Sequence, residues 1–189
     1  MKKNLLLITV LVFTGLLGYL AFSWDGKDAK VNTTDNPLYA RFQALASEGN
    51  SSCSGAFTDS ISSMPDNSRI KGSCCSSMSW HRYQEQVEGL KKYKDVSVIP
   101  PDPYDIDAKL AKQMKSHYDD ELTPEQQKSY DFAMANSNEK GPCCCKCWHW
   151  DAYEGLAKKL IVDYGWNSEQ IAQLWDISDA CGGAGHEHG

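Results

Sequence analysis

Along most of the chain, apolar residues recur every three or four positions, which is the period of an amphipathic helix. One clear stripe follows Ser79 and consists of Trp80, Tyr83, Val87, Leu90 and Tyr93. The alternation typical of a strand is found only from Val96 to Ile99. The pattern therefore predicts an all-α fold, a small helical bundle of about five to six helices.

Capping residues mark where several of these helices begin. Asn36 precedes Pro37, so an N-cap stands before a proline in the first turn. Thr123 and Gln126 have the spacing of a capping box. The other predicted starts are at Asp105, near His149 and at Asn167, and the predicted stops are Gly49, Gly165 and Gly182-Gly183. The serine-rich stretch 50–73 predicts a loop with at most one short helix.

The first 23 residues lack a polar face and differ from the rest of the chain. Lys2 and Lys3 precede eighteen mostly apolar residues, Leu5 to Phe22, which is close to the length that spans a bilayer. We expect residues 1–23 to form a single-pass anchor in the cytoplasmic membrane, with the lysines inside and the body outside the cytoplasm. Small residues before Trp24 leave open a cleaved signal peptide, in which case the body is exported.

Beyond this segment the sequence divides into three parts. Residues 24–35 are small and polar and predict a tether, residues 36–183 predict a cysteine-rich helical domain, and residues 184–189 are a histidine-containing tail. After residue 23 the chain holds 17 basic against 25 acidic residues, a charge of −8. An acidic body repels nucleic acid and anionic lipid and attracts cations, so we expect no nucleic-acid partner.

Eight cysteines fall into clusters and are not spread evenly. They are Cys53, Cys74, Cys75, Cys143, Cys144, Cys145, Cys147 and Cys181. The two main clusters resemble each other, because each has a glycine, a cysteine pair and a further sulfur three or four residues later. Each is followed by a Trp-His pair and a helical segment that carries Glu-Gly-Leu. This weak internal repeat predicts two sulfur-rich loops that each lead into the N-terminus of a helix.

Thiolates are soft ligands, and clusters of them suit Cu(I) or Zn(II). The Cys144-x-x-Cys147 spacing lets one turn of chain present two sulfurs to one ion. A helix N-terminus favours the thiolate form, since its partial positive charge lowers the thiol pKa. The thioether of Met78 adds a ligand used mainly with Cu(I), which makes Cu(I) the first choice and Zn(II) the second.

The candidate ligands follow from these clusters. The principal ligands are predicted to be Cys143, Cys144, Cys145 and Cys147. The residues predicted to complete this site or to form a second one are Cys74, Cys75 and Met78. Further candidates, at the loop ends and near the C-terminus, are His81, His149, Cys181, His186 and His188.

Disulfide bonds are the main alternative, because an even number of cysteines outside the cytoplasm usually means crosslinks. Four bridges would staple the helices into an interaction module that docks a partner protein. Two observations favour metal. Adjacent cysteines do not reach disulfide geometry with each other, and four cysteines within five residues gain little loop-closure entropy. Thiol redox chemistry is a minor alternative.

No catalytic motif is visible in the sequence, so we do not expect an enzyme. Trp148 separates Cys147 from His149, which argues against the Cys-x-x-Cys-His pattern of covalently attached haem. The sequence has neither a glycine-rich phosphate loop nor a Gly-x-Ser-x-Gly turn. Helical surroundings also argue against a thioredoxin-like motif, which needs a strand–helix–strand setting.

The segment from Pro142 to Cys147 reads Pro-Cys-Cys-Cys-Lys-Cys. It resembles the Pro-Cys-Tyr-Cys-Gly-Cys motif of a family of membrane-anchored, cysteine-rich bacterial proteins, many of which are lipoproteins. Cys144 stands where the family has tyrosine, and Lys146 stands where it has glycine. No cysteine precedes Cys53, so the resemblance does not extend to lipid attachment. The resemblance implies a bacterial cell-surface protein that handles metal.

Together these patterns predict an extracytoplasmic, membrane-anchored protein that binds a soft metal ion. Capture, delivery or sequestration of Cu(I) is the expected role, and a partner protein that exchanges the metal follows from delivery. The alternative function is a disulfide-stapled helical interaction module without bound metal.

Overall fold

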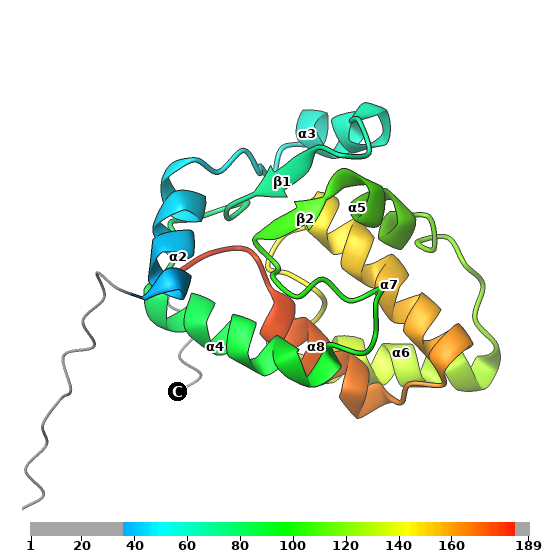
Figure 1. The fold of residues 1–189 in the computed structure, drawn as a ribbon. Helices are drawn as coiled ribbons and strands as arrows, with labels where there is room; N and C mark the ends of the chain where they lie inside the picture. The colour runs from blue at the N-terminus through cyan, green and yellow to red at the C-terminus, as the bar shows by residue number, and fades with distance from the viewer. Residues whose placement is uncertain (1–35, 184–189) are drawn as a thin grey trace, which may run out of the picture. The chain divides into compact units, whose positions relative to one another are not determined.

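In a computed structural model of the protein, residues 36–183 are described, and they are mostly helical (Figure 1). Seven α-helices and one two-stranded sheet make up this part of the chain. The predicted anchor, tether and histidine tail lie outside the described residues. Among the helices of residues 36–183, none is long and apolar enough to cross a membrane.

The helices occupy nearly the positions that the hydrophobic pattern predicts. The α-helices are α2 (Pro37–Ser47), α3 (Gly55–Ser60), α4 (Trp80–Leu90), α5 (Ala108–Lys115), α6 (Pro124–Asn136), α7 (Trp148–Tyr164) and α8 (Ser168–Ser178). The 3-10 helices that follow α3 and α4 are η2 (Ile61–Ser63) and η3 (Lys91–Tyr93). The prediction of an all-α bundle of about five to six helices is therefore confirmed only in its helical character, because the described residues form seven α-helices and a two-stranded sheet. α3 is the short helix of the serine-rich stretch.

The predicted capping residues begin three of the helices. Asn36 accepts hydrogen bonds from two backbone N–H groups at the start of α2. Thr123 and Gln126 form a reciprocal capping box at α6. Asn167 forms a second capping box with Gln170 at α8. Each cap satisfies N–H groups that the first turn of a helix leaves without a partner.

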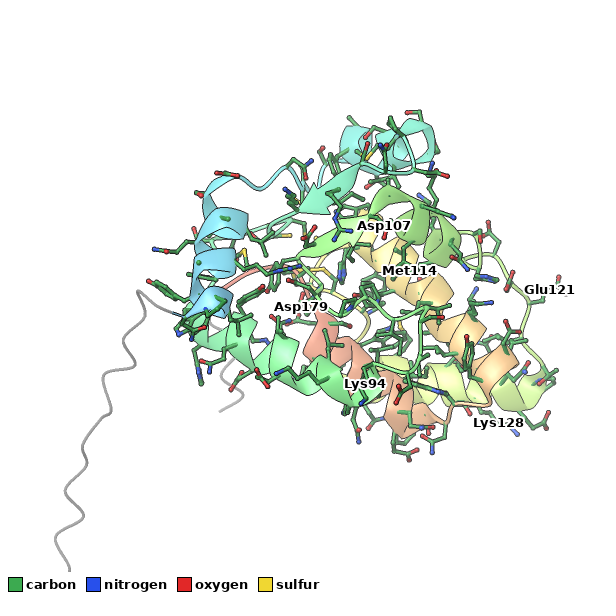
Figure 2. The ribbon with its side chains drawn as sticks, in the orientation of Figure 1. Lys94, Asp107, Met114, Glu121, Lys128 and Asp179 are labelled. Carbon is green, nitrogen blue, oxygen red and sulfur yellow. A yellow bond between two sulfur atoms is a disulfide. The ribbon has the colours of Figure 1, made fainter. Side chains whose placement is uncertain are left out.

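A short antiparallel sheet forms where the sequence predicts none. β1 (Arg69–Lys71) pairs with β2 (Asp105–Asp107), and Ile106 is buried at the centre of the pair. The prediction that Asp105 caps a helix is therefore wrong. Asp107 is the N-cap instead, and its carboxylate accepts a hydrogen bond from a backbone N–H in the first turn of α5 (Figure 2). Strands of three residues are too short to show alternation, so the pattern does not detect them.

Two other features differ from what the sequence suggested. Residues 96–99, the one candidate for a strand, form turns, and they bury Val98 and Ile99 in the main hydrophobic core. α8 ends at Ser178 and not at Gly182-Gly183. The chain leaves the helix there because residues 179–183 form backbone hydrogen bonds with a distant segment, which no local pattern shows.

α7 is the central element of the fold (Figure 1). It packs against α5, α6 and α8, and most of its length is buried in the main core. α5 approaches α7 closely at Gly155, where a Cβ would lie 2.2 Å from the Met114 carbonyl oxygen. Leu156 and Leu160 are fully buried, and truncation of such a side chain to alanine costs about 2–5 kcal/mol. The core thus fixes α7, whose N-terminal end carries the second cysteine cluster.

A smaller hydrophobic cluster joins α2, α4 and the C-terminal segment. Its buried members are Leu45, Tyr83, Tyr104 and Ala180. Asp102 ties the connector before β2 to this cluster, since its Oδ2 accepts hydrogen bonds from Arg41 and the Tyr83 hydroxyl, both at 2.8 Å. Because Ala180 directly precedes Cys181, the same cluster helps to place that cysteine.

Candidate metal centre

Three segments that are far apart in the sequence meet beside the N-terminus of α7. They are the first cysteine loop (residues 72–78), the second cysteine loop (residues 141–147) and the C-terminal segment (residues 179–183). The backbone hydrogen bonds that join the first loop to the C-terminal segment are Cys74 N–H to Ala180 O (3.1 Å), Ser76 N–H to Cys181 O (2.8 Å) and Gly183 N–H to Ser77 O (2.7 Å). These bonds bring Cys181 next to the first cysteine pair.

Gly182 makes the close pairing of these two segments possible. Its φ of +83° lies in the left-handed region, and a Cβ there would lie 2.3 Å from the Ser76 carbonyl oxygen. Glycine is the residue type that tolerates both conditions. The Gly182-Gly183 pair, predicted from the sequence to stop a helix, therefore positions Cys181 instead.

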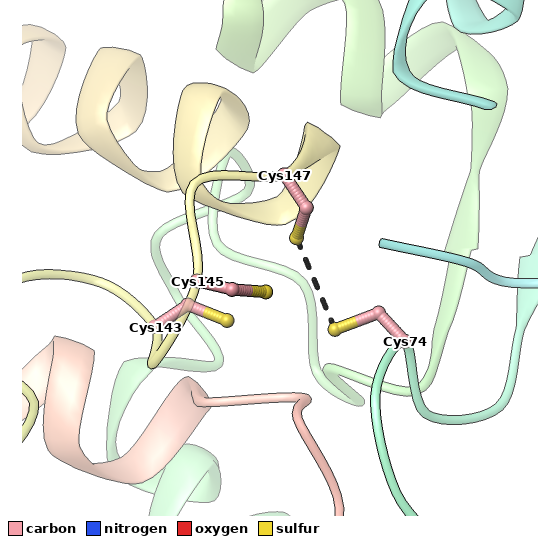
Figure 3. Close-up of side chains that lie close together, drawn as sticks. All are labelled: Cys74, Cys143, Cys145 and Cys147. Carbon is pink, nitrogen blue, oxygen red and sulfur yellow. Dashed lines mark hydrogen bonds between the residues drawn. The ribbon is translucent and has the colours of Figure 1, made fainter. Parts of the chain in front are cut away.

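The second cysteine loop is fixed at both ends. At its start, the Gly141 N–H donates a hydrogen bond to the buried Ser137 hydroxyl at 2.8 Å. At its end, Cys147 is the N-cap of α7. The Cys147 N–H also donates to the Cys145 carbonyl at 3.0 Å, so the chain turns sharply before the helix. This turn directs the sulfurs of Cys143, Cys145 and Cys147 toward the first loop (Figure 3).

The sulfur atoms of the two loops are in contact. Cys74 Sγ lies 3.6 Å from Cys75 Sγ and 3.9 Å from Cys147 Sγ, and a hydrogen bond joins the latter pair (Figure 3). Cys75 Sγ lies 3.1 Å from Cys145 Sγ. Two sulfurs on one tetrahedral ion stand about 3.8 Å apart, because metal–thiolate bonds are about 2.3 Å long. The two spacings of Cys74 therefore suit coordination of a shared ion, and Cys75 and Cys145 would move slightly apart to share one.

Seven of the sulfurs form overlapping groups of four. Within each group, all four sulfurs lie within 4.8 Å of one another. The groups are Cys74, Cys143, Cys145 and Cys147; Cys74, Cys75, Cys145 and Cys181; and Cys143, Cys144, Cys145 and Cys181. Cys145 belongs to all three groups, and Cys74 belongs to two. This cysteine cluster could hold a metal ion.

Cys53 extends the cluster in a way that the sequence does not indicate. Its N–H donates to the Cys74 carbonyl at 3.1 Å, and a hydrogen bond between its thiol and that of Cys75 raises the pKa of Cys53. Trp148 anchors the same segment, since its indole N–H donates to the Ser51 hydroxyl at 3.0 Å. All eight cysteines of the chain therefore gather at one place.

Cys143 and Cys181 form a disulfide, with their Cα atoms 6.6 Å apart, and it links the second loop to the C-terminal segment. The other six cysteines are free. Every group of four contains Cys143 or Cys181, so the intact disulfide leaves no such group with four free thiols in residues 36–183. The two sets of three free thiols that remain are Cys74, Cys145 and Cys147, and Cys74, Cys75 and Cys145.

The thiols differ in their pKa values. The hydrogen bond with Cys74 lowers the pKa of Cys147 to about 6, and N–H groups at the start of α7 act in the same direction. The pKa of Cys74 is raised by that same hydrogen bond and by burial. Burial also raises the pKa of Cys145, and it raises that of Cys144 to about 12. A cation that binds the cluster must therefore displace protons from most of the thiols.

The position of Cys144 bears on thiol redox chemistry. Its sulfur is 2.8 Å from that of Cys181, within reach of the disulfide. Attack on a disulfide requires the thiolate, and a pKa of about 12 makes the Cys144 thiolate scarce at neutral pH. The arrangement therefore does not favour rapid thiol–disulfide exchange by this residue.

The cluster has a buried side and an exposed side. The buried cysteines are Cys74, Cys143, Cys147 and Cys181. The exposed cysteines are Cys53, Cys75 and Cys144. Cys145 lies between the two sides and has intermediate exposure. An ion can thus approach from solvent at one side and be held by buried sulfurs at the other.

The other predicted ligands lie outside the sulfur groups. His81 is exposed on α4, and its Nε2 is 3.2 Å from a Glu85 carboxylate oxygen. His149 is buried and stacks on Tyr153, with ring centroids 4.1 Å apart. Met78 packs against the smaller hydrophobic cluster. The predicted cysteine ligands are thus brought together without these three residues, and the two tail histidines lie outside the described residues.

The fold and the cluster define a mostly helical domain with a thiol site that could hold a metal ion. No protein-family model, curated protein or solved structure matches this chain. Function is therefore inferred from the chemistry of the site, since helical domains of this kind support many functions.

Proposed function

We propose that this protein binds Cu(I) through its thiol cluster and that it captures, delivers or sequesters the ion. The observation that carries the proposal is the convergence of two cysteine loops. Cys75 and Cys145 are 70 residues apart in the sequence, and their sulfurs lie 3.1 Å apart. Thiolates select soft ions, whereas hard ions such as Ca²⁺ and Mg²⁺ prefer oxygen ligands.

The disulfide supports Cu(I) over Zn(II). A structural zinc site takes four protein ligands in tetrahedral geometry. While Cys143 and Cys181 are bonded to each other, the overlapping groups offer sets of three free thiols. Cu(I) is a soft ion that thiolates select, whereas a set of three thiols leaves a structural zinc site one protein ligand short. It therefore fits the oxidised site, and Zn(II) is the second choice.

Exchange of the ion with a partner protein is supported by the exposed side of the cluster. Cys75 is exposed and belongs to one of the sets of three free thiols, so an incoming thiol can reach an ion at this position without unfolding the domain. Cys74 and Cys147 are buried and retain the ion between exchanges. A cluster with one exposed and one buried side suits capture and delivery, because an ion can pass to a partner as its ligands are replaced one at a time.

We also propose that the domain works outside the cytoplasm, held by the N-terminal apolar segment. The length of the stretch from Leu5 to Phe22 supports this location. The disulfide is consistent with an oxidising compartment. The resemblance of residues 142–147 to a motif of membrane-anchored bacterial proteins points the same way.

The test is the metal content of the full chain after expression with added copper or zinc. We expect copper to be retained, and we expect the double variant Cys145→Ser/Cys147→Ser to lose it. Met114→Leu is the control, because Met114 is buried in the core and leucine conserves its volume. Retention of copper by the double variant would contradict the assignment of these ligands.

The Cys143–Cys181 disulfide favours a second function, a stapled interaction module, but it accounts for only this one pair of cysteines. Alkylation of the exported protein followed by non-reducing mass spectrometry distinguishes the two. Six alkylated cysteines are expected for a metal site of free thiols. If all eight cysteines are paired, the metal-binding proposal is lost.

A further inference from the structure

We propose that the cluster binds two Cu(I) ions and that the thiolates of Cys74 and Cys145 bridge them. This inference rests on the proposed function and specifies the stoichiometry and the bridging residues of that site. It follows from the overlap of the two sets of free thiols. One set is Cys74, Cys145 and Cys147, and the other is Cys74, Cys75 and Cys145.

The two sets share two of their three sulfurs. An ion in each set must therefore use Cys74 and Cys145 as common ligands. Cys147 completes the coordination of the first ion, and Cys75 completes that of the second. Because the shared pair bridges the ions, four thiolates supply three ligands to each of two ions. Two separate sites would need more thiolates to do the same.

The sulfur spacings favour three-coordinate ions over linear ones. With bonds of about 2.3 Å, a linear ion places its two sulfurs about 4.6 Å apart, and a trigonal ion places them about 4.0 Å apart. Cys74 Sγ is 3.9 Å from Cys147 Sγ and 3.6 Å from Cys75 Sγ. Cys75 and Cys145 are closer still, at 3.1 Å. Cys75 and Cys145 must move apart in either geometry, but all three pairs need larger movements for linear ions than for trigonal ones.

Charge and burial are compatible with a second ion. Cys74 and Cys147 are buried, and buried thiolates are costly unless cations compensate them. One Cu(I) on three thiolates leaves a net charge of −2, because the fourth cysteine keeps its proton. A second ion that binds together with the fourth thiolate leaves the net charge at −2, so it adds no uncompensated charge. The exposed Cys75 lets the second ion reach its position from solvent.

Binding is a ligand substitution in which copper stays in the +1 state. The bonds between each Cu(I) and the weak ligands that deliver it break, and copper–sulfur bonds form. Thiol protons of the four cysteines pass to the buffer, and the weak ligands are released. No electrons move, so the Cys143–Cys181 disulfide stays intact.

The experiment uses the full chain, purified without reductant so that the disulfide is preserved. Under argon it is titrated with Cu(I) supplied as its acetonitrile complex, in competition with a chromophoric Cu(I) chelator. We expect two equivalents per chain and a copper neighbour in the X-ray absorption of the bound copper. One equivalent without a copper neighbour overturns the two-ion proposal and leaves the proposed function standing. No retained copper overturns the proposed function as well.

Single substitutions identify the bridging residues. Cys75→Ser and Cys147→Ser each remove a ligand from one ion, so each is expected to leave one equivalent. Cys145→Ser removes a ligand from both ions, so we expect weaker retention of both and no copper neighbour. Met114→Leu is the control, since Met114 is buried in the core on α5 and belongs to none of the sulfur groups, and it should retain two equivalents.

Retention of two neighbouring ions by Cys145→Ser would contradict the assigned bridge. Circular dichroism of each variant shows whether the helices are intact. The titration of the unsubstituted protein does not depend on the variants, so the two-ion stoichiometry is decided even where a substitution prevents folding.

Discussion

Individual cysteines in this protein have different environments although they lie close together. Cys147 is at a helix N-terminus, where the sequence predicts a lowered thiol pKa, and its pKa is indeed lowered to about 6. The largest cause, however, is the hydrogen bond with Cys74, which is 73 residues away in the sequence. The position of Cys147 at a helix N-terminus thus indicates that its pKa is lowered, and the hydrogen bond with Cys74 causes most of the lowering.

His149 shows the opposite case, a residue whose sequence context suggests a ligand but whose surroundings do not. Its side chain is fully buried, and neither ring nitrogen makes a well-formed hydrogen bond among the described residues, although the Ser178 backbone lies near enough to raise the pKa slightly. Burial lowers the pKa of His149 to about 3, so the ring is neutral at physiological pH. An unpartnered buried polar group costs about 1–3 kcal/mol.

We therefore expect His149→Phe to raise the free energy of unfolding by about 1 kcal/mol. The phenyl ring keeps the stacking on Tyr153 and removes the unpartnered nitrogens. Denaturant unfolding measures the change, and copper retention is measured on the same sample. Retention should be unchanged, and a loss of copper with this variant would instead assign His149 as a ligand.

At the level of elements, the helices follow local signals, and the segments that form the site do not. The capping boxes at Thr123 and Asn167 need only residues three positions away, so they are readable in the sequence. The C-terminal segment is held by backbone bonds to the first cysteine loop, more than 100 residues earlier in the case of Cys74 and Ala180. Such a pairing leaves no periodic pattern.

The pairing of these two segments gives an element-scale prediction at Gly182. Gly182→Ala is expected to lower the free energy of unfolding by about 2–3 kcal/mol, because it combines a left-handed φ with a backbone clash at Ser76. The displaced segment carries Cys181 and contacts Cys74, so copper capacity should fall too. Denaturant unfolding and copper titration measure the two effects.

Gly165→Ala is the matched control for this substitution. Gly165 also has a left-handed φ, at +65°, but it ends α7 in open space, with nothing within 4 Å of a Cβ. For Gly165→Ala we expect the free energy of unfolding to fall only by the conformational cost of about 1–2 kcal/mol. We expect this variant to bind as much copper as the unsubstituted protein. Equal copper capacities of the two variants would contradict a role of the C-terminal segment in forming the site.

For the whole molecule, buried tyrosines connect stability to pH. Burial is the largest cause of a raised pKa at four of them, Tyr83, Tyr104, Tyr130 and Tyr153. Each binds its proton more tightly in the folded protein than in the unfolded chain, where the pKa is 10.0. The stabilisation of the folded protein by these protonated tyrosines is therefore complete below pH 10 and is lost as the pH rises above it.

Above pH 10, we expect the free energy of unfolding to fall by about 1.4 kcal/mol per pH unit for each buried tyrosine. Tyrosinate absorbance and far-UV circular dichroism, recorded together against pH, should change in one transition for these residues. Tyr153→Phe should move the transition to higher pH, and the exposed Tyr164→Phe should not. Ionisation of buried tyrosines well before loss of helix would contradict this prediction.

The sequence by itself determined most of the helices, the caps at Asn36, Thr123 and Asn167 and the presence of two sulfur-rich loops, because these depend on residues a few positions apart. It did not determine the short sheet, the place of Cys53 or the pairing of Cys143 with Cys181, since these depend on contacts between distant segments. Only the tertiary structure decided that the sulfurs of both loops share one centre. A soft ion requires ligands within a few ångströms of one another, and chain folding alone brings residues 75 and 145 that close.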